Sequence, residues 1–216
     1  KNYNPAVLIA YNLASTLYVD YDSLRTTLNN LASYNKPMFI RFACEMICSS
    51  LGDNPTEYVD VFRRVADMVH EYPNFAVVWS PVDIGALDRP FSYYYPGDGY
   101  VDWIGVSCYS FKYFQGRQNN LDKEAVYFMT GDYAWATNRL KPIIKFMEQN
   151  NIKKPVMISE GGVATNNQYG EDYAAWNTPR MRNMLYNVIM KYPKLIMINY
   201  LNNFRGVEFE RFDITD

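Results

Sequence analysis

The sequence has little of the residue types on which many catalytic sites depend. One histidine, His70, stands among 216 residues, so a histidine-dependent triad or a histidine-rich metal site is not expected. Three cysteines are too few for a disulfide scaffold, although a Cys48–Cys108 bridge stays open. Cys44 and Cys48 are a weak zinc signal because no second pair follows. We therefore expect no metal and no cofactor.

Long apolar runs and blocks of one charge are also missing. No segment approaches the roughly 20 apolar residues of a membrane span. The net charge is −2, and the sequence contains no basic block, which argues against nucleic acid and anionic membrane surfaces as partners. With 49% hydrophobic residues, residues 1–216 are expected to form one domain with its own core.

Aromatic residues are abundant instead, with 20 tyrosines, 12 phenylalanines and 4 tryptophans. Many fall in expected loops, as in residues 91–95. Flat, amphipathic rings suit the faces of sugars, but they suit protein interfaces and ordinary packing equally well. Composition alone leaves these uses open.

Apolar runs predict six buried strands. They lie near residues 6–11, 37–45, 75–80, 103–109, 155–160 and 195–200. Helical or long-loop connections separate them, which is typical of a parallel sheet. Two architectures fit this pattern: a doubly wound open sheet, and a (β/α)8 barrel without its first two βα units.

Helical periodicity and capping residues predict the connecting helices. They are expected over about residues 23–34 with Asp22 as N-cap, from Pro55 to near Pro73 with Asn54 as N-cap, over 133–150 with a kink or restart at Pro142, and over 178–192 with Thr178 as cap and Met181, Leu185, Val188 and Ile189 inward. Residues 111–132 lack a clear period and are long enough for a functional loop.

Two charges interrupt the strand at 37–45. Side chains alternate along a strand, so Arg41 and Glu45 are expected on one face. Burying them is costly unless both are paired. They form either a structural ion pair or a catalytic acid with its supporting arginine, because βα barrels keep their chemistry at the carboxyl ends of strands.

A second glutamate, Glu160, ends the strand at 155–160 in the same way. Two carboxyl groups facing each other across a cleft are the apparatus of glycoside hydrolysis, in which one protonates the leaving oxygen and the other is nucleophile or base. The alternative is that Glu160 pairs with Arg41 and both are structural. Incomplete burial at strand ends favours the functional interpretation.

Two aromatic residues at strand ends are further candidates. Tyr109 could hydrogen-bond a carboxylate and hold it ionised, or it could be a rim tyrosine packed on a loop. Trp79 could be a platform for a sugar ring or a cap on the core, and the platform is slightly favoured.

Several strings taken together resemble glycoside hydrolase family 26, the β-mannanase family of the retaining (β/α)8 clan. They occur in family order along about residues 37–202, at residues 41–46, 58–66, 78–81, 94–105 and 157–161. The resemblance implies a (β/α)8 barrel. This chain would contain about six of its βα units, with strands 3–8, so the barrel domain is expected to be N-terminally incomplete. Another segment or chain would then complete the barrel.

The resemblance also implies a function: retaining, endo-β-mannanase-like hydrolysis of a β-linked polysaccharide by double displacement. It further implies which residues carry out this reaction. Glu45 matches the general acid/base, Glu160 the nucleophile, and Arg41 the arginine before the acid/base. Tyr109 matches the tyrosine that contacts the nucleophile, and Trp79 the strand-5 tryptophan. A polysaccharide or oligosaccharide substrate and a secreted or cell-surface location follow from the same resemblance.

Three positions depart from the family pattern. Cys44 and Ile47 replace a usual histidine and asparagine beside the acid/base, and Gly161 replaces a common aromatic residue after the nucleophile. These departures keep an alternative open, in which a catalytically weak or inactive barrel serves as a glycan-binding or structural assembly module. A hydrolase with a cysteine nucleophile ranks far behind, since no partner histidine is expected nearby.

Overall fold

The computed structural model describes residues 5–82, 89–112, 132–166 and 171–202. Contacts divide the chain into two compact units. The first comprises residues 1–105 and 146–155, and the second comprises residues 106–145 and 156–216. The loop predicted over residues 111–132 lies mostly outside the described residues, and the single domain stays a prediction.

Six strands form one sheet whose order follows the sequence. They are β1 (Val7–Tyr11), β2 (Met38–Phe42), β3 (Phe75–Trp79), β4 (Trp103–Ser110), β5 (Val156–Val163) and β6 (Leu195–Ile198). The pairs β1–β2, β2–β3, β3–β4 and β5–β6 are parallel. A doubly wound sheet reverses its strand order at a switch point, and the described strands do not. The order is that of a (β/α)8 barrel, to which the described residues contribute six strands.

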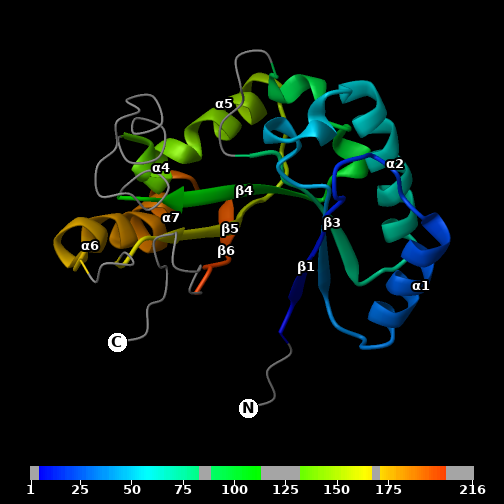
Figure 1. The fold of residues 1–216 in the computed structure, drawn as a ribbon, viewed down its shortest axis with the longest axis horizontal. Coiled ribbons are helices and arrows are strands. Elements are labelled where there is room, and N and C mark those ends of the chain that lie inside the picture. The colour runs from blue at the N-terminus through cyan, green and yellow to red at the C-terminus, as the bar shows by residue number, and fades with distance from the viewer. Residues whose placement is uncertain (1–4, 83–88, 113–131, 167–170, 203–216) are drawn as a thin grey trace. The chain divides into compact units, whose positions relative to one another are not determined.

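In the first unit, α1 (Tyr21–Ala32) and α2 (Pro55–His70) lie side by side along the strands (Figure 1). Phe62 of α2 packs on Phe42 of β2, with ring centroids 5.9 Å apart. Asn54 caps α2 as predicted, because its side-chain oxygen accepts from the Glu57 amide at 3.2 Å.

The N-cap of α1 is Asp20, not the predicted Asp22. The Asp20 carboxylate accepts from the amides of Asp22 and Ser23, both at 3.1 Å. These bonds lower the pKa of Asp20 from its ordinary 3.8, with the Ser23 amide as the largest cause. Asp22 instead supplies the negative charge in the first helical turn.

Pro142 restarts the helix predicted over 133–150, giving α4 (Ala136–Arg139) and α5 (Lys141–Gln149). Short 3₁₀ helices occupy Met46–Cys48, Ser50–Gly52, Phe91–Tyr93, Asp98–Tyr100 and Asp132–Ala134. None of the described helices is long and apolar enough to cross a membrane.

The last helical segment begins earlier than predicted. It runs through α6 (Ala174–Arg182), a π-helical turn η7 (Asn183–Asn187) and α7 (Val188–Lys191), so Thr178 does not cap it. The π turn widens the helix and shifts the phase of its buried face. Leu185 and Ile189, predicted to face inward, are 45% and 42% exposed, whereas Met184 and Val188 are buried. The buried position of Val188 was predicted correctly.

Candidate active site

A buried arginine and a partly exposed glutamate meet at the carboxyl end of β2. The side chain of Arg41 is 2% exposed, and that of Glu45 is 43% exposed. Arg41 Nη2 lies 3.8 Å from Glu45 Oε1, so the two charges are paired, as one of the interpretations left open by the sequence requires. The buried guanidinium thereby faces a carboxylate that reaches solvent, which suits a catalytic acid as well as an ion pair.

The backbone between these residues turns into the left-handed region. β2 ends at Phe42 and not at residue 45, and both Ala43 (φ 41°) and Glu45 (φ 58°) have positive φ. The prediction that simple alternation sets the direction of Glu45 is therefore wrong. A left-handed non-glycine residue costs about 1–3 kcal/mol and persists where surrounding contacts hold it, as functional sites often do.

Two backbone hydrogen bonds hold this turn. The Ala43 amide donates to the Tyr11 carbonyl at 2.9 Å, and the Glu45 amide donates to the Ser80 carbonyl at 2.9 Å. Each neighbouring strand therefore fixes one of the two left-handed residues. The turn is anchored on both sides even though it contains no glycine.

Ser80 is a site residue that sequence reasoning missed. It is fully buried, and its Oγ accepts a hydrogen bond from Arg41 Nε at 3.0 Å. A signal was available, because a polar residue that directly follows a buried strand needs a partner. Register supplies the face: Arg41 pairs with Val78, and Ser80 follows two residues later.

The sugar-platform interpretation of Trp79 is wrong, and its alternative, a cap on the core, describes the structure. Ile40 pairs with Val77, so period-two alternation puts Trp79 on the face opposite to Arg41. Its side chain is fully buried. The indole packs edge-on against Phe91 at 6.4 Å, and Tyr95 and Phe146 also contact it.

Two tyrosines of the first unit, Tyr58 and Tyr95, remain protonated at ordinary pH. Burial raises the pKa of Tyr58 well above its ordinary value of 10.0. Burial also raises the pKa of Tyr95, as does the hydrogen bond that its hydroxyl donates to Asp98 at 2.6 Å. Neither hydroxyl is therefore suited to act as an acid in catalysis.

Cys44 lies between the two left-handed residues, where the family usually has histidine. Its thiol donates to Asn12 Oδ1 at 2.9 Å, so position 44 keeps a polar contact. None of the three cysteines is in a disulfide, so the possible Cys48–Cys108 bridge is not formed. The described residues contain no group of three side chains suited to hold a metal ion. His70 ends α2, and its Nε2 lies 3.0 Å from Asp102 Oδ2.

In the second unit, a tyrosine hydroxyl contacts the other predicted catalytic glutamate. Tyr109 of β4 donates to Glu160 Oε1 at 2.5 Å. A bond this short is typical of a hydroxyl on an ionised carboxylate. Strand β5 continues to Val163, so Glu160 does not end its strand as predicted. It is nevertheless only half-buried.

Tyr109 is itself held by a packed cluster. It shares that cluster with the buried Ala164 and Tyr173, and Phe111 and Trp176 pack against it. The ring therefore has little freedom to swing away from Glu160.

An ion pair lies next to this cluster. Lys112 Nζ lies 4.4 Å from the centroid of the Tyr173 ring and pairs with Glu171 Oε1 at 2.5 Å. It ties the segment after β4 to the segment that leads into α6.

Close packing of the backbone explains the glycine that follows Glu160. A Cβ on Gly161 would lie 2.3 Å from the Cys108 carbonyl oxygen and 2.9 Å from Met184 Cε. No side chain fits there, so the aromatic residue common in the family at this position is sterically excluded.

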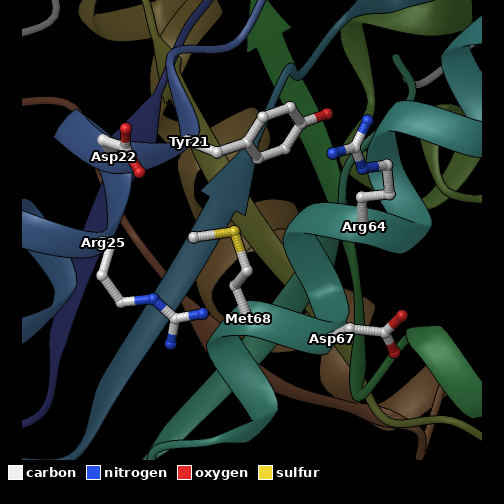
Figure 2. A pocket seen from close by; sticks show the side chains of 6 residues that line it. All are labelled: Tyr21, Asp22, Arg25, Arg64, Asp67 and Met68. Atoms are coloured by element: carbon white, nitrogen blue, oxygen red, sulfur yellow. The ribbon is translucent and has the colours of Figure 1, made fainter.

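A hollow of about 280 Å³ lies between α1 and α2, away from these residues (Figure 2). Its lining includes Tyr21, Arg25 and Arg64. Arg64 stacks on the Tyr21 ring at 4.1 Å, and Arg25 forms an ion pair with Glu71. The arginines at this hollow thus serve helix packing, and no predicted site residue lines it.

Comparisons with known proteins agree with this fold. The family model for glycosyl hydrolase family 26 matches residues 10–187. GH26C from a Muricauda species has a similar structure, with a TM-score of 0.56 and 17% identity over 85% of this chain and 49% of that chain. The catalytic domain of a Bacillus endo-β-1,4-mannanase gives a TM-score of 0.55 at 19% identity, over 88% of this chain and 50% of that chain.

Curated sequences point in the same direction. A β-1,3-xylanase of Vibrio sp. is 24% identical over 168 residues, which are 72% of this chain and 33% of that protein. The chain thus spans about one third of the length of this curated relative. The match to the family model covers most of the chain and includes both candidate glutamates. This chain belongs to glycosyl hydrolase family 26.

Proposed function

We propose that the protein is a retaining glycoside hydrolase that cleaves β-linked polysaccharide, resembling the endo-β-mannanases. Glu45 is the general acid/base and Glu160 is the nucleophile. The observation that carries the proposal is the family match over residues 10–187, which includes both glutamates. The contacts of the two glutamates support their different roles.

The reaction proceeds as a double displacement. Protonated Glu45 gives its proton to the glycosidic oxygen while the Glu160 carboxylate attacks the anomeric carbon, so the leaving sugar departs as an alcohol and a glycosyl-enzyme ester forms. Glu45, now ionised, takes a proton from water. The resulting hydroxide oxygen bonds to the anomeric carbon, the ester to Glu160 breaks, and both glutamates return to their starting states.

The surrounding residues fit these roles. A nucleophile must be ionised and oriented, and the Tyr109 hydroxyl at 2.5 Å favours the charged form of Glu160. An acid/base must exchange protons with water and substrate, and the 43% exposure of the Glu45 side chain permits that. Arg41 places a buried positive charge 3.8 Å from Oε1 of Glu45, on the side of the carboxylate that faces the protein.

The substrate class is a β-linked glycan, for which two relatives suggest the first substrates to test. One is an endo-β-1,4-mannanase and the other a β-1,3-xylanase, so β-1,4-mannan and β-1,3-xylan are the first substrates to test. Because such polymers are too large to enter cells, we propose a secreted or cell-surface location. We further propose that another segment or chain supplies the two remaining strands of the barrel.

Trapping of the intermediate tests the assignment. The protein is incubated with activated 2-deoxy-2-fluoro glycosides of mannose and xylose, digested and analysed by mass spectrometry. A fluorosugar ester on Glu160 is expected, with no label on the Glu160→Gln variant. Label on another residue would overturn the assignment of the nucleophile. Binding of polysaccharide without release of reducing ends, unchanged in Glu160→Gln, would instead favour the inactive glycan-binding barrel.

A further inference from the structure

We infer that Ser80 is a positioning residue for the acid/base, an inference that rests on the proposed role of Glu45. Ser80 contacts this part of the site twice. Its hydroxyl accepts from Arg41 Nε at 3.0 Å, and its carbonyl accepts from the Glu45 amide at 2.9 Å. One residue at the end of β3 therefore holds both the guanidinium that faces Glu45 and the backbone that carries it.

The hydroxyl contact fixes a plane. A guanidinium group is rigid and flat, so a hydrogen bond at Nε sets the directions of its other N–H groups. Arg41 and Ser80 are both buried, and a buried bond to a charged group is stronger and better defined than an exposed one. Ser80 thus sets where Nη2 of Arg41 points, and Nη2 is the nitrogen nearest to the Glu45 carboxylate.

The carbonyl contact fixes the turn. Glu45 has a φ of 58°, which a residue with a side chain adopts only at a cost. The bond from its amide to the Ser80 carbonyl helps to offset that cost and to set the direction of the side chain. Since this contact uses the backbone, replacement of the Ser80 side chain leaves it in place. The variant Ser80→Ala therefore isolates the contribution of the hydroxyl.

The chemistry of the leaving group separates positioning of the acid from general loss of structure. Protonation by Glu45 matters when the leaving oxygen is a poor leaving group, as in a polysaccharide. It matters little when the leaving group is a stable anion such as dinitrophenolate. A misplaced acid/base should therefore slow glycosyl transfer from the polysaccharide and spare transfer from the dinitrophenyl glycoside. Structural damage would slow both.

The test compares kcat/KM for these two substrates in Ser80→Ala and wild type. We expect a loss of about tenfold or more on the polysaccharide, within the 10²–10⁴-fold that general acid catalysis contributes, and a loss below about twofold on the dinitrophenyl glycoside. Ser80→Thr, which keeps the hydroxyl, should recover most of the polysaccharide rate. Ser33→Ala removes a hydroxyl at the exposed end of α1, where it bonds only to a neighbouring carbonyl at 2.6 Å, and should match wild type on both substrates.

Equal losses on the two substrates, or no loss on either, would overturn the inference. If Ser80→Ala does not fold, Arg41→Lys carries the same test, because lysine keeps the charge but lacks the Nε–H that Ser80 accepts. The Nε–H resonance of Arg41 is a readout that needs no activity. Its protection from solvent exchange should fall in Ser80→Ala, and unchanged protection would refute the contact. If the wild-type protein is inactive but the Arg41 Nε–H still loses protection in Ser80→Ala, the result counts against the proposed function and leaves the Ser80 contact standing.

Discussion

Substitution of Gly161 by alanine should damage the second unit more than a single methyl group normally does. The added Cβ would lie 2.3 Å from the carbonyl oxygen of Cys108. Real Cβ atoms essentially never approach closer than 3.0 Å, so the two segments must separate by at least 0.7 Å, the difference between these two distances. The obstructing atom belongs to the backbone of β4, which cannot rotate away as a flexible side chain can.

The magnitude follows from this geometry. Overpacking a well-packed interior costs about 1–3 kcal/mol, and a clash with backbone belongs at the upper end, near 3 kcal/mol. For a chain of this length, each kcal/mol lowers the melting temperature by about 2–4 °C, so Gly161→Ala should melt about 6–12 °C below wild type. Urea unfolding gives the free energy directly, and a thermal scan checks the shift.

A second glycine provides the control. A Cβ on Gly99 meets no atom within 4 Å, and the residue is exposed. The variant Gly99→Ala should therefore stay within about 0.5 kcal/mol of wild type, as surface substitutions usually do. Equal stabilities for Gly161→Ala and Gly99→Ala would refute the reasoning, because they would mean that β4 and β5 yield at no cost.

Three further substitutions test individual contacts. Asp20→Asn keeps the helix cap but cannot titrate. Because the pKa of Asp20 is lowered in the folded state, wild type should melt at a higher temperature than this variant by a constant amount above about pH 5. That difference should disappear as the pH falls through the pKa of Asp20 in the folded state. Asn151, the second residue after α5, has a φ of 54°, so urea unfolding of Asn151→Gly should show a gain of about 0.5–1 kcal/mol. Asn150→Gly, which removes a side-chain bond to the Phe146 carbonyl, should instead lose stability. Tyr109→Phe removes the hydroxyl that bonds Glu160, so unfolding should cost about 1.5 kcal/mol less and labelling of Glu160 by the fluorosugar should slow; an unchanged labelling rate would exclude a role for this hydroxyl.

The parts of the fold that depend on local chemistry were predictable from the sequence. Apolar runs located all six strands, and Asn54 before Pro55 located the start of α2. Alternating strands and helices also predicted a parallel sheet, but they could not choose between an open sheet and a barrel. That choice depends on which strands pair, and pairing is a long-range property that periodicity does not contain.

Backbone conformation was the main source of error at the site. Alternation assumes an extended strand, and the left-handed conformations of Ala43 and Glu45 end β2 before that assumption applies. A similar error affected the last helix, where the π turn η7 moved Leu185 to the surface. In both places a non-glycine sequence adopts a backbone that propensity does not indicate. The sugar-platform interpretation of Trp79 was wrong for a different reason. The face of the sheet on which Trp79 lies, relative to Arg41, depends on the register between β2 and β3, which the sequence of β3 alone does not contain.

The departures from the family pattern bear on whether the barrel is active. An inactive barrel would be expected to lose the groups that hold its glutamates, since nothing would then select for them. The structure instead gives two of the three departures a local contact: the Cys44 thiol bonds Asn12, and the bare Cα of Gly161 admits the Cys108 carbonyl. Meanwhile a buried guanidinium still faces Glu45, and a buried tyrosine still bonds Glu160. Keeping a buried arginine is costly unless it is paired, so these retained partners favour the proposed hydrolase over the inactive barrel.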